Sequence, residues 1–238
     1  MTRDAVGSGR SRSSWAVVAG SAGGVGREIA LRLAEDGYSV VVCGRDGAGV
    51  RETRQLIEWA GGRAVEVAAD LGDCAAVHRL IDEITRVLAG APVEVLVNNA
   101  GEADYGSSAD ELDMAFELNV KTPFLLTEAF APAMAARGRG AIVDVGGLDT
   151  VMRPGDRTAM RAATAALNAL TRLWTAEYGP KGVRVNAVDP HCGNEPGAVA
   201  EAIRFLVSPR AASVQGAVLT MGEQTGMVES HKYSSAPV

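Results

Sequence analysis

Cysteine, aromatic residues and long apolar runs are all scarce in this chain of 238 residues. The three cysteines, Cys43, Cys74 and Cys192, lie far apart, which favours neither a disulfide framework nor a zinc site, and no metal is expected. No apolar run approaches the ~18 residues that a membrane-spanning helix needs. Only 5% of the residues are aromatic whereas 28 are glycine, which predicts a core of small aliphatic side chains and close packing of helices on a sheet.

Positive charge is also in deficit, because 23 Lys and Arg residues face 29 Asp and Glu residues, a net charge of −6. Nucleic acids and anionic membranes both select clustered positive charge, so neither is expected as a partner. Residues 1–14 are polar and rich in Ser, Gly and Arg, without an apolar stretch after the charges. This pattern predicts a flexible N-terminal tail and no secretory signal. A cytoplasmic location is the simplest expectation.

Short apolar runs alternate along the chain with segments of helical periodicity. The runs rich in small and β-branched residues are 15–19, 39–43, 64–69, 93–97, 141–145 and 183–188. The helical segments between them include 26–36, 51–60, 75–88 and 110–136. Buried runs that alternate with amphipathic helices indicate βαβ units and a parallel sheet covered on both faces. The sequence therefore predicts a single α/β domain over residues 15–238, with a doubly wound, Rossmann-type parallel sheet.

A glycine-rich turn follows the first predicted strand and leads into a helix. Its central residues are Gly20, Ser21, Gly24, Val25 and Gly26. Glycines let the backbone turn sharply and approach a pyrophosphate, and the helix that follows points its positive end at the phosphates. The turn therefore predicts a dinucleotide site formed by these residues. The alternative is a tight turn that serves packing alone.

The ends of the second and third predicted strands indicate which dinucleotide is bound. Arg45 follows the second strand, where an arginine can hold the 2′-phosphate of NADP and an acidic residue would favour NAD. Asp70 and Leu71 follow the third strand, where a carboxylate can reach the adenine amino group. The prediction is NADP. A solvated surface charge is the alternative interpretation of Arg45.

These motifs, taken in chain order, resemble those of the short-chain dehydrogenase/reductase family. The glycine turn matches the pattern T-G-x-x-x-G-x-G, with Ala19 in place of the threonine. Residues 98–101 match the family element N-N-A-G after the fourth strand. The resemblance implies that Asn98, Ala100 and Gly101 also bind the cofactor.

Further matches extend the resemblance from Trp15 to about Leu219. They are Asn119 on the long fourth helix, residues 186–190 (N-x-V-x-P) and the C-terminal segments 203–209 and 216–219. The resemblance implies the family's fold over nearly the whole chain. Since members of this family assemble as dimers or tetramers, it also implies a homodimer or homotetramer.

The same resemblance places the family's catalytic positions on residues of other types. Members that interconvert carbonyls and alcohols use a serine at the end of the fifth strand, a tyrosine 13 residues later and a lysine four beyond it. Those positions hold Gly147, Met160 and Thr164 here. Asn119 remains, but an asparagine alone delivers no proton. The resemblance therefore implies an atypical member with a degenerate catalytic site.

Few side chains are candidates to replace the missing ones. Besides Asn119, His191 follows the N-x-V-x-P motif, where the family backbone passes the nicotinamide, and imidazole transfers protons at neutral pH. Asp144 and Asp149 flank the missing serine, and Asp189 lies within the motif. A desolvated carboxylate there can act as a general base. The alternative for His191 and for each aspartate, Asp149 included, is an exposed loop residue.

The segment that covers the substrate in the family is nearly absent. Only the short stretch from Glu195 to Ile203 separates the nicotinamide-contacting position from the C-terminal motif. Glu195 stands where the family has a threonine, and its charge would repel a nearby pyrophosphate. A shallow or open pocket is the expectation.

Three functions stay open on this sequence. The first is non-redox or unusual NADP(H)-linked chemistry, such as cyclisation, dehydration or isomerisation, on a small carbonyl compound of polyketide-like or aromatic type. The second is an NADP(H)-dependent ketone reductase that receives its proton from water or substrate. The third is a catalytically inactive homologue that serves as a regulatory partner in a hetero-oligomer with an active relative.

Overall fold

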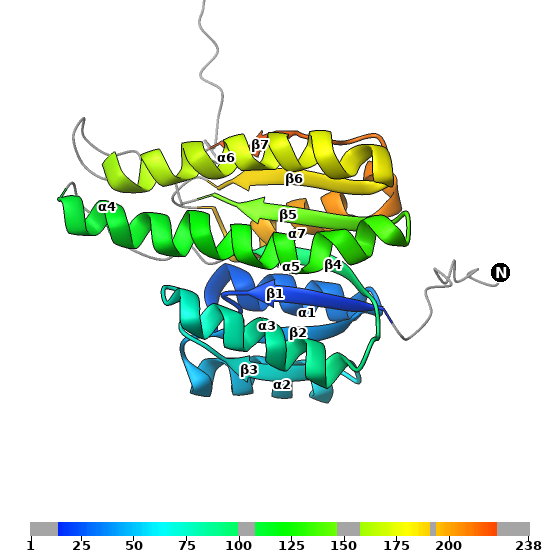
Figure 1. Ribbon diagram of the computed structural model, residues 1–238. Coiled ribbons are helices and arrows are strands. Elements are labelled where there is room, and N and C mark those ends of the chain that lie inside the picture. Colours follow the sequence, from blue (N-terminus) through cyan, green and yellow to red (C-terminus); the bar gives the residue numbers. More distant parts are fainter. Residues whose placement is uncertain (1–13, 100–107, 147–157, 191–193, 223–238) are drawn as a thin grey trace, which may run out of the picture.

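A parallel sheet of seven strands, in the order β3-β2-β1-β4-β5-β6-β7, forms the centre of the protein (Figure 1). The computed structural model describes residues 14–99, 108–146, 158–190 and 194–222. The strands are β1 (Trp15–Ala19), β2 (Ser39–Gly44), β3 (Arg63–Ala68), β4 (Val93–Asn98), β5 (Gly140–Val145), β6 (Val183–Asp189) and β7 (Val218–Thr220). Every pair of neighbouring strands is parallel, which confirms the predicted doubly wound α/β fold.

Helices cover both faces of the sheet. They are α1 (Gly24–Glu35), α2 (Gly47–Trp59), α3 (Cys74–Leu88), α4 (Ala109–Phe116), α5 (Thr122–Ala136), α6 (Thr158–Tyr178) and α7 (Pro196–Val207). In Figure 1, α3, α5 and α6 lie in front of the sheet and α1, α2 and α7 behind it. Successive strand residues alternate between the two resulting cores: Val17 packs on the α3 side and Val18 on the α1 side. This is why the central strands β1 and β2 consist almost entirely of apolar and small residues.

The long helix predicted over residues 110–136 is interrupted in the structure. Between α4 and α5 lies a π-helical turn, η1 (Glu117–Lys121). Pro123 follows the turn and favours the interruption, because proline has no N–H to donate to the Asn119 carbonyl four residues earlier. π-helical turns of this kind occur often at functional sites. The sequence predicted the helix and missed its break, although Pro123 was the available signal.

Ser14 at one end of the described chain and strand β7 at the other were not predicted as part of the folded sheet. Ser14, the last residue of the predicted tail, is buried, and its carbonyl accepts a hydrogen bond from the Ser39 N–H (3.0 Å). The rest of that tail lies outside the described residues. At the other end, β7 adds a three-residue edge strand beside β6, and it is too short to leave a clear alternating pattern.

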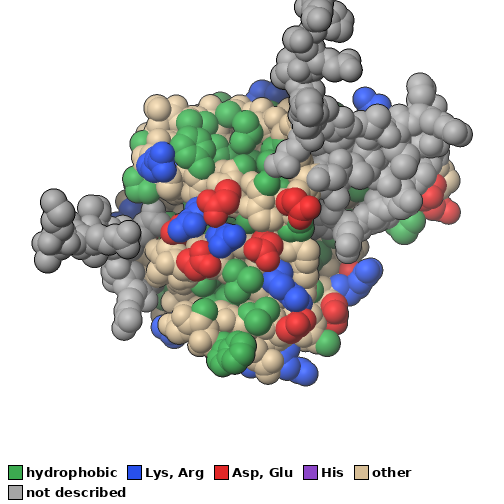
Figure 2. Space-filling model, turned by 180° about the vertical axis from the view of Figure 1, so that it is seen from behind, with side chains coloured by type: hydrophobic (Ala, Val, Ile, Leu, Met, Phe, Trp, Pro, Cys, Tyr) green, Lys and Arg blue, Asp and Glu red, His purple; other side chains and the backbone are tan. Residues whose placement is uncertain are grey.

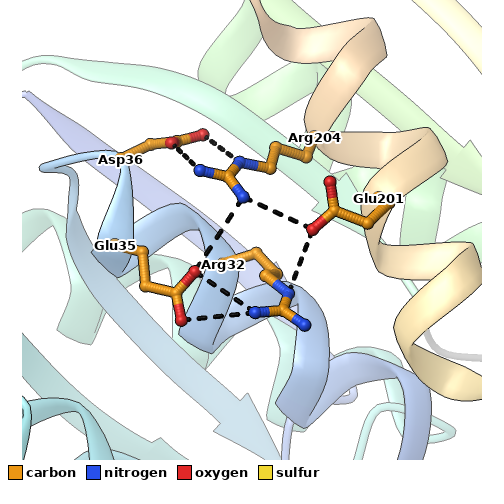
Figure 3. A network of polar contacts seen from close by, with 5 residues as sticks. All are labelled: Arg32, Glu35, Asp36, Glu201 and Arg204. Carbon is orange, nitrogen blue, oxygen red and sulfur yellow. Dashed lines mark hydrogen bonds and ion pairs between the residues drawn. The ribbon is translucent and has the colours of Figure 1, made fainter.

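A network of charged side chains joins α1 to α7 (Figure 3). Arg204 of α7 donates two hydrogen bonds to Asp36, of 2.9 and 2.6 Å, and Arg32 of α1 pairs with Glu201 at 3.2 Å. A two-point contact between guanidinium and carboxylate fixes orientation as well as distance. Asp36 is the C-terminal cap of α1, so the network holds the end of the helix that lies opposite the glycine turn. Elsewhere on this side of the molecule, acidic and basic side chains are interspersed (Figure 2).

Candidate dinucleotide and active site

The carboxyl ends of the strands bring the candidate residues to one edge of the sheet. The strand order reverses between β1 and β4. Gly20 directly follows β1, and Asn99 directly follows β4. Gly146 and Asp189 lie at the corresponding ends of β5 and β6. In sheets of this type, ligands bind in the crevice outside such a switch point. The candidate residues that the structure describes at this edge lie on both sides of the switch point.

The glycine turn is locked onto the end of β4. Gly20 has φ +67°, and a Cβ added there would lie 1.7 Å from the Asn99 carbonyl oxygen. A Cβ on Gly26 would lie 2.1 Å from the Gly20 carbonyl oxygen, and the Asn99 side-chain amide donates to that same oxygen at 3.2 Å. Gly20 and Gly26 are therefore required for packing of the turn. Asn99, which was not among the predicted site residues, is the residue that positions the turn.

The tip of the turn, at Gly23 and Gly24, is less crowded than its base at Gly20 and Gly26. Gly24 has φ +50°, and no heavy atom of the described residues lies within 4 Å of a Cβ added at Gly23 or Gly24. Gly23 caps α1 without a side-chain hydrogen bond among the described contacts, so the first N–H groups of α1, around Val25, have no side-chain cap there. A glycine cradle at a helix N-terminus suits a pyrophosphate. The residues present therefore fit a dinucleotide.

Ser21 holds the turn to β2. Its hydroxyl donates to the Val18 carbonyl (2.7 Å) and accepts from the Cys43 N–H (3.0 Å), and its own N–H donates to the Cys43 carbonyl (3.0 Å). Ser21 is buried. Ser21 therefore connects the glycine turn to β1 and β2. Its contact with the cofactor stays a prediction.

The residues predicted to bind the adenosine half lie at the ends of β2 and β3. Arg45 is exposed, and Asp70 is exposed with its carboxylate accepting from the Gly72 N–H at 3.0 Å. Leu71 is buried, and its carbonyl accepts a hydrogen bond from the Thr122 hydroxyl. Arg45 and Asp70 are thus accessible from solvent, whereas the side chain of Leu71 belongs to the core.

A buried polar cluster lies behind the site, on the α6 side of the sheet. The Asn98 amide donates to Asp144 Oδ1 (2.8 Å), and the Thr171 hydroxyl donates to Asp144 Oδ2 (2.7 Å). Asp144 is fully buried, and this burial raises the pKa of its carboxyl to about 6. Asn98 was predicted to bind the cofactor; the structure shows its side chain inside this cluster, where it joins β4 to β5.

Helix α6 carries two of the three replaced catalytic positions. Met160 is buried and Thr164 is half-buried, one turn further along the helix. A Cβ added at Gly146 would lie 3.1 Å from Thr164 Cγ2 and 2.1 Å from Asp189 Oδ1. The Asn168 amide donates to Asp189 Oδ2 at 2.9 Å. The structure thus brings Thr164 together with Asp189. Thr164 and Asn168 are four residues apart, and this spacing in the sequence indicates that they share one face of α6.

Asn119 lies in the π-helical turn η1. It is buried, and its side-chain amide donates to the Ala115 carbonyl at 3.0 Å. Ala115 packs against Ala159 and Ala163 of α6, which flank Met160. The turn is held on its other side, where the Cys74 thiol of α3 donates to Glu117 at 3.0 Å. Asn119 therefore lies on the segment that contacts the start of α6.

Five predicted residues, Ala100, Gly101, Gly147, Asp149 and His191, lie outside the described residues. In the ranges that the structure describes, no group of three or more His, Cys, Asp or Glu side chains is arranged to hold a metal ion. Over the same ranges, no helix is long and apolar enough to cross a membrane.

The strand order, the glycine turn and the helix that follows it define a Rossmann-type α/β fold. Residues 14–201 match a family model described as short chain dehydrogenase, so the chain belongs to the short-chain dehydrogenase family. Galactitol 2-dehydrogenase (L-tagatose-forming) of Cereibacter sphaeroides is 32% identical, over 87% of this chain and 92% of that protein. (3R)-3-hydroxyacyl-CoA dehydrogenase of Canis lupus familiaris is 29% identical, over 87% of this chain and 94% of that protein.

Solved structures agree with this assignment. A metagenomic short-chain oxidoreductase in complex with NADP has a TM-score of 0.77 and 32% sequence identity, over 87% of this chain and 96% of that one. The hydroxysteroid dehydrogenase from Escherichia coli has a TM-score of 0.79 and 28% identity, over 87% of this chain and 93% of that one. The chain is thus a member of an oxidoreductase family.

Proposed function

We propose that this protein is an NADP(H)-dependent oxidoreductase that interconverts a carbonyl group and an alcohol on a small molecule. The observation that carries the proposal is the open glycine cradle at the N-terminus of α1, locked in place by Asn99. Relatives along nearly the whole chain are dehydrogenases, which favours redox chemistry over cyclisation, dehydration or isomerisation. NADP in a structural neighbour and Arg45 at the end of β2 support the choice of the phosphorylated cofactor.

The residues have distinct roles in this proposal. The backbone N–H groups around Gly24 and Val25 would hold the pyrophosphate, Arg45 the 2′-phosphate and Asp70 the adenine amino group. NADP(H), when bound, supplies or accepts the hydride. The serine, tyrosine and lysine positions of the family are Gly147, Met160 and Thr164, so we propose that water or the substrate provides the proton. Asn119, His191 and Asp149 remain the candidate protein groups.

The proposed cofactor preference depends on Arg45. We expect Arg45→Asp to weaken NADP⁺ binding by at least about tenfold, because a charge-assisted contact to the 2′-phosphate is lost and repulsion replaces it. NAD⁺ binding should be retained or strengthened. Calorimetric titration of both cofactors measures the change, with Arg210→Asp as a control that removes an exposed arginine from η3 (Pro209–Ala211). Equal losses for NADP⁺ and NAD⁺ would contradict the role of Arg45.

We further propose that the protein forms a homodimer or homotetramer through α5 and α6. Phe124 of α5 and Leu173 of α6 are 43% and 64% exposed, and the Phe124 ring lies 6.4 Å from the ring of Trp174. Two adjoining helices thus present apolar side chains to solvent, which favours association. The same surface would serve a hetero-oligomer with an active relative.

Leu173→Glu tests this surface. We expect it to convert the assembly to monomers, because the new charge would have to be desolvated on association. Light scattering coupled to size-exclusion chromatography measures the mass. Trp59→Glu on α2, at a residue 91% exposed, is the matched control and should leave the mass unchanged. A monomeric wild type, or an unchanged Leu173→Glu oligomer, would show that the proposed interface is wrong.

A further inference from the structure

A carboxylate at the end of β6 lies in the site without belonging to the family's catalytic set. Asp189 is the last residue of β6, and Gly146 beside it binds the β6 backbone through its N–H (2.8 Å to the Val188 carbonyl). The Asp189 side chain lies over Gly146 and next to Thr164, with Asn168 donating to Oδ2 at 2.9 Å. Three elements, β5, β6 and α6, therefore fix its position at the carboxyl edge of the sheet.

The structure also indicates which half of a dinucleotide reaches this edge. The pyrophosphate cradle stands between β1 and β4, and Arg45 and Asp70 lie on the side of β2 and β3. A dinucleotide bound across the switch point places its two halves on opposite sides of it. With the adenosine half over β2 and β3, the nicotinamide half would lie toward the ends of β4, β5 and β6. Asp189 belongs to that side.

The two redox forms of the cofactor differ in charge at the nicotinamide. The oxidised ring carries one positive charge and the reduced ring carries none. A fixed carboxylate near the ring would attract only the oxidised form, and in a partly buried site such an attraction is strong enough for about a tenfold difference in affinity. Thr164 stands at the position where the family has a lysine, so the side chain next to Asp189 on α6 is neutral.

We propose that Asp189 makes this site bind the oxidised, cationic form of the nicotinamide cofactor in preference to the reduced form. The proposal rests on the proposed function, since it requires the cofactor to bind. If the protein binds the oxidised cofactor more tightly than the reduced one, the oxidised product of hydride transfer is stabilised. The bound reduced cofactor is then a stronger hydride donor than the same cofactor free in solution. Asp189 would thus be a specificity-determining residue for the cofactor's redox state.

The test compares the dissociation constants of NADP⁺ and NADPH, measured by calorimetry, in the wild type and three variants. Asp189→Asn keeps the shape of the side chain and removes its charge. Thr164→Lys places a cation beside Asp189 and keeps the carboxylate. For both we expect the preference for NADP⁺ over NADPH to fall by about five- to tenfold. Asp82→Asn, which removes the same charge from α3, should leave the preference unchanged.

The possible failures are distinguishable. If the wild type binds neither form, the proposed function is wrong. If both forms bind but the preference stays the same in Asp189→Asn and Thr164→Lys, or changes equally in Asp82→Asn, the inference about Asp189 is overturned while the proposed function stands. Should Asp189→Asn fail to fold, as judged by circular dichroism, Thr164→Lys decides the question alone.

Discussion

Gly20→Ala is expected to lower the free energy of unfolding by about 4 kcal/mol and to abolish cofactor binding. Two costs add at this position. The left-handed conformation, φ +67°, costs an alanine about 1–2 kcal/mol. In addition, the new Cβ would lie 1.7 Å from the Asn99 carbonyl oxygen, so β4 and the turn must move apart. Urea unfolding and NADP⁺ titration measure the two effects.

Gly24→Ala is the matched control for this prediction. Gly24 also has a positive φ, +50°, but no described heavy atom lies within 4 Å of an added Cβ. Only the conformational cost of about 1–2 kcal/mol is therefore expected. Equal destabilisation by the two variants would contradict the conclusion that close approach to Asn99, and not φ alone, requires glycine at position 20.

Asp144→Asn is expected to stabilise the protein at alkaline pH. Burial raises the pKa of this carboxyl from 3.8 to about 6, so the folded state holds the proton more tightly than the unfolded state does. The folded protein loses stability as the pH rises from the unfolded pKa to the folded one, and above it the cost stays constant at about 3 kcal/mol. Asparagine carries no charge at any pH and avoids this cost.

The hydrogen bonds of the cluster accommodate the substitution. An asparagine at position 144 accepts from Asn98 through its oxygen and donates through its amide to the Thr171 hydroxyl. That hydroxyl can then donate to the Leu167 carbonyl, 3.0 Å away. We expect a gain of about 3 kcal/mol at pH 8 and little or none at pH 4, measured by urea unfolding.

Asp110→Asn, at an exposed residue in the first turn of α4, is the control and should show no such gain at pH 8. An Asp144→Asn gain that is the same at both pH values would mean that ionisation of Asp144 is not the cause. A loss at pH 8 would show that the carboxylate stabilises the cluster.

Most of the fold could be predicted because strands buried on both faces form short runs made mainly of apolar residues. The run of small and β-branched residues from Ser39 to Cys43, for example, forms β2 with Gly44 added at its end. The π-helical turn could not be predicted from periodicity, since apolar residues occur all round the α5 segment and leave no clear face whose phase could shift. The local signal is Pro123, which has no N–H to donate to the carbonyl four positions earlier.

The glycine turn of the candidate site could be located from the sequence, because the path of the backbone itself requires the glycines. Gly20 and Gly26 were predicted from their spacing, and the structure places them at the switch point. The side-chain roles were harder, because they depend on contacts between distant segments. Nothing in the local sequence shows that Asn98 turns toward Asp144, or that Asp189 of β6 meets Thr164 of α6. These pairs become visible only when the strands are placed side by side.

Titration of the wild-type protein with NADPH, followed by the fluorescence of the reduced nicotinamide and by calorimetry, shows whether the glycine cradle binds a cofactor. We expect saturable binding of one cofactor per chain with a dissociation constant below about 1 mM. Gly20→Ala should not bind under the same conditions. Absence of saturable NADPH binding by the folded wild type at millimolar concentrations would contradict the assignment of the glycine cradle as a cofactor site.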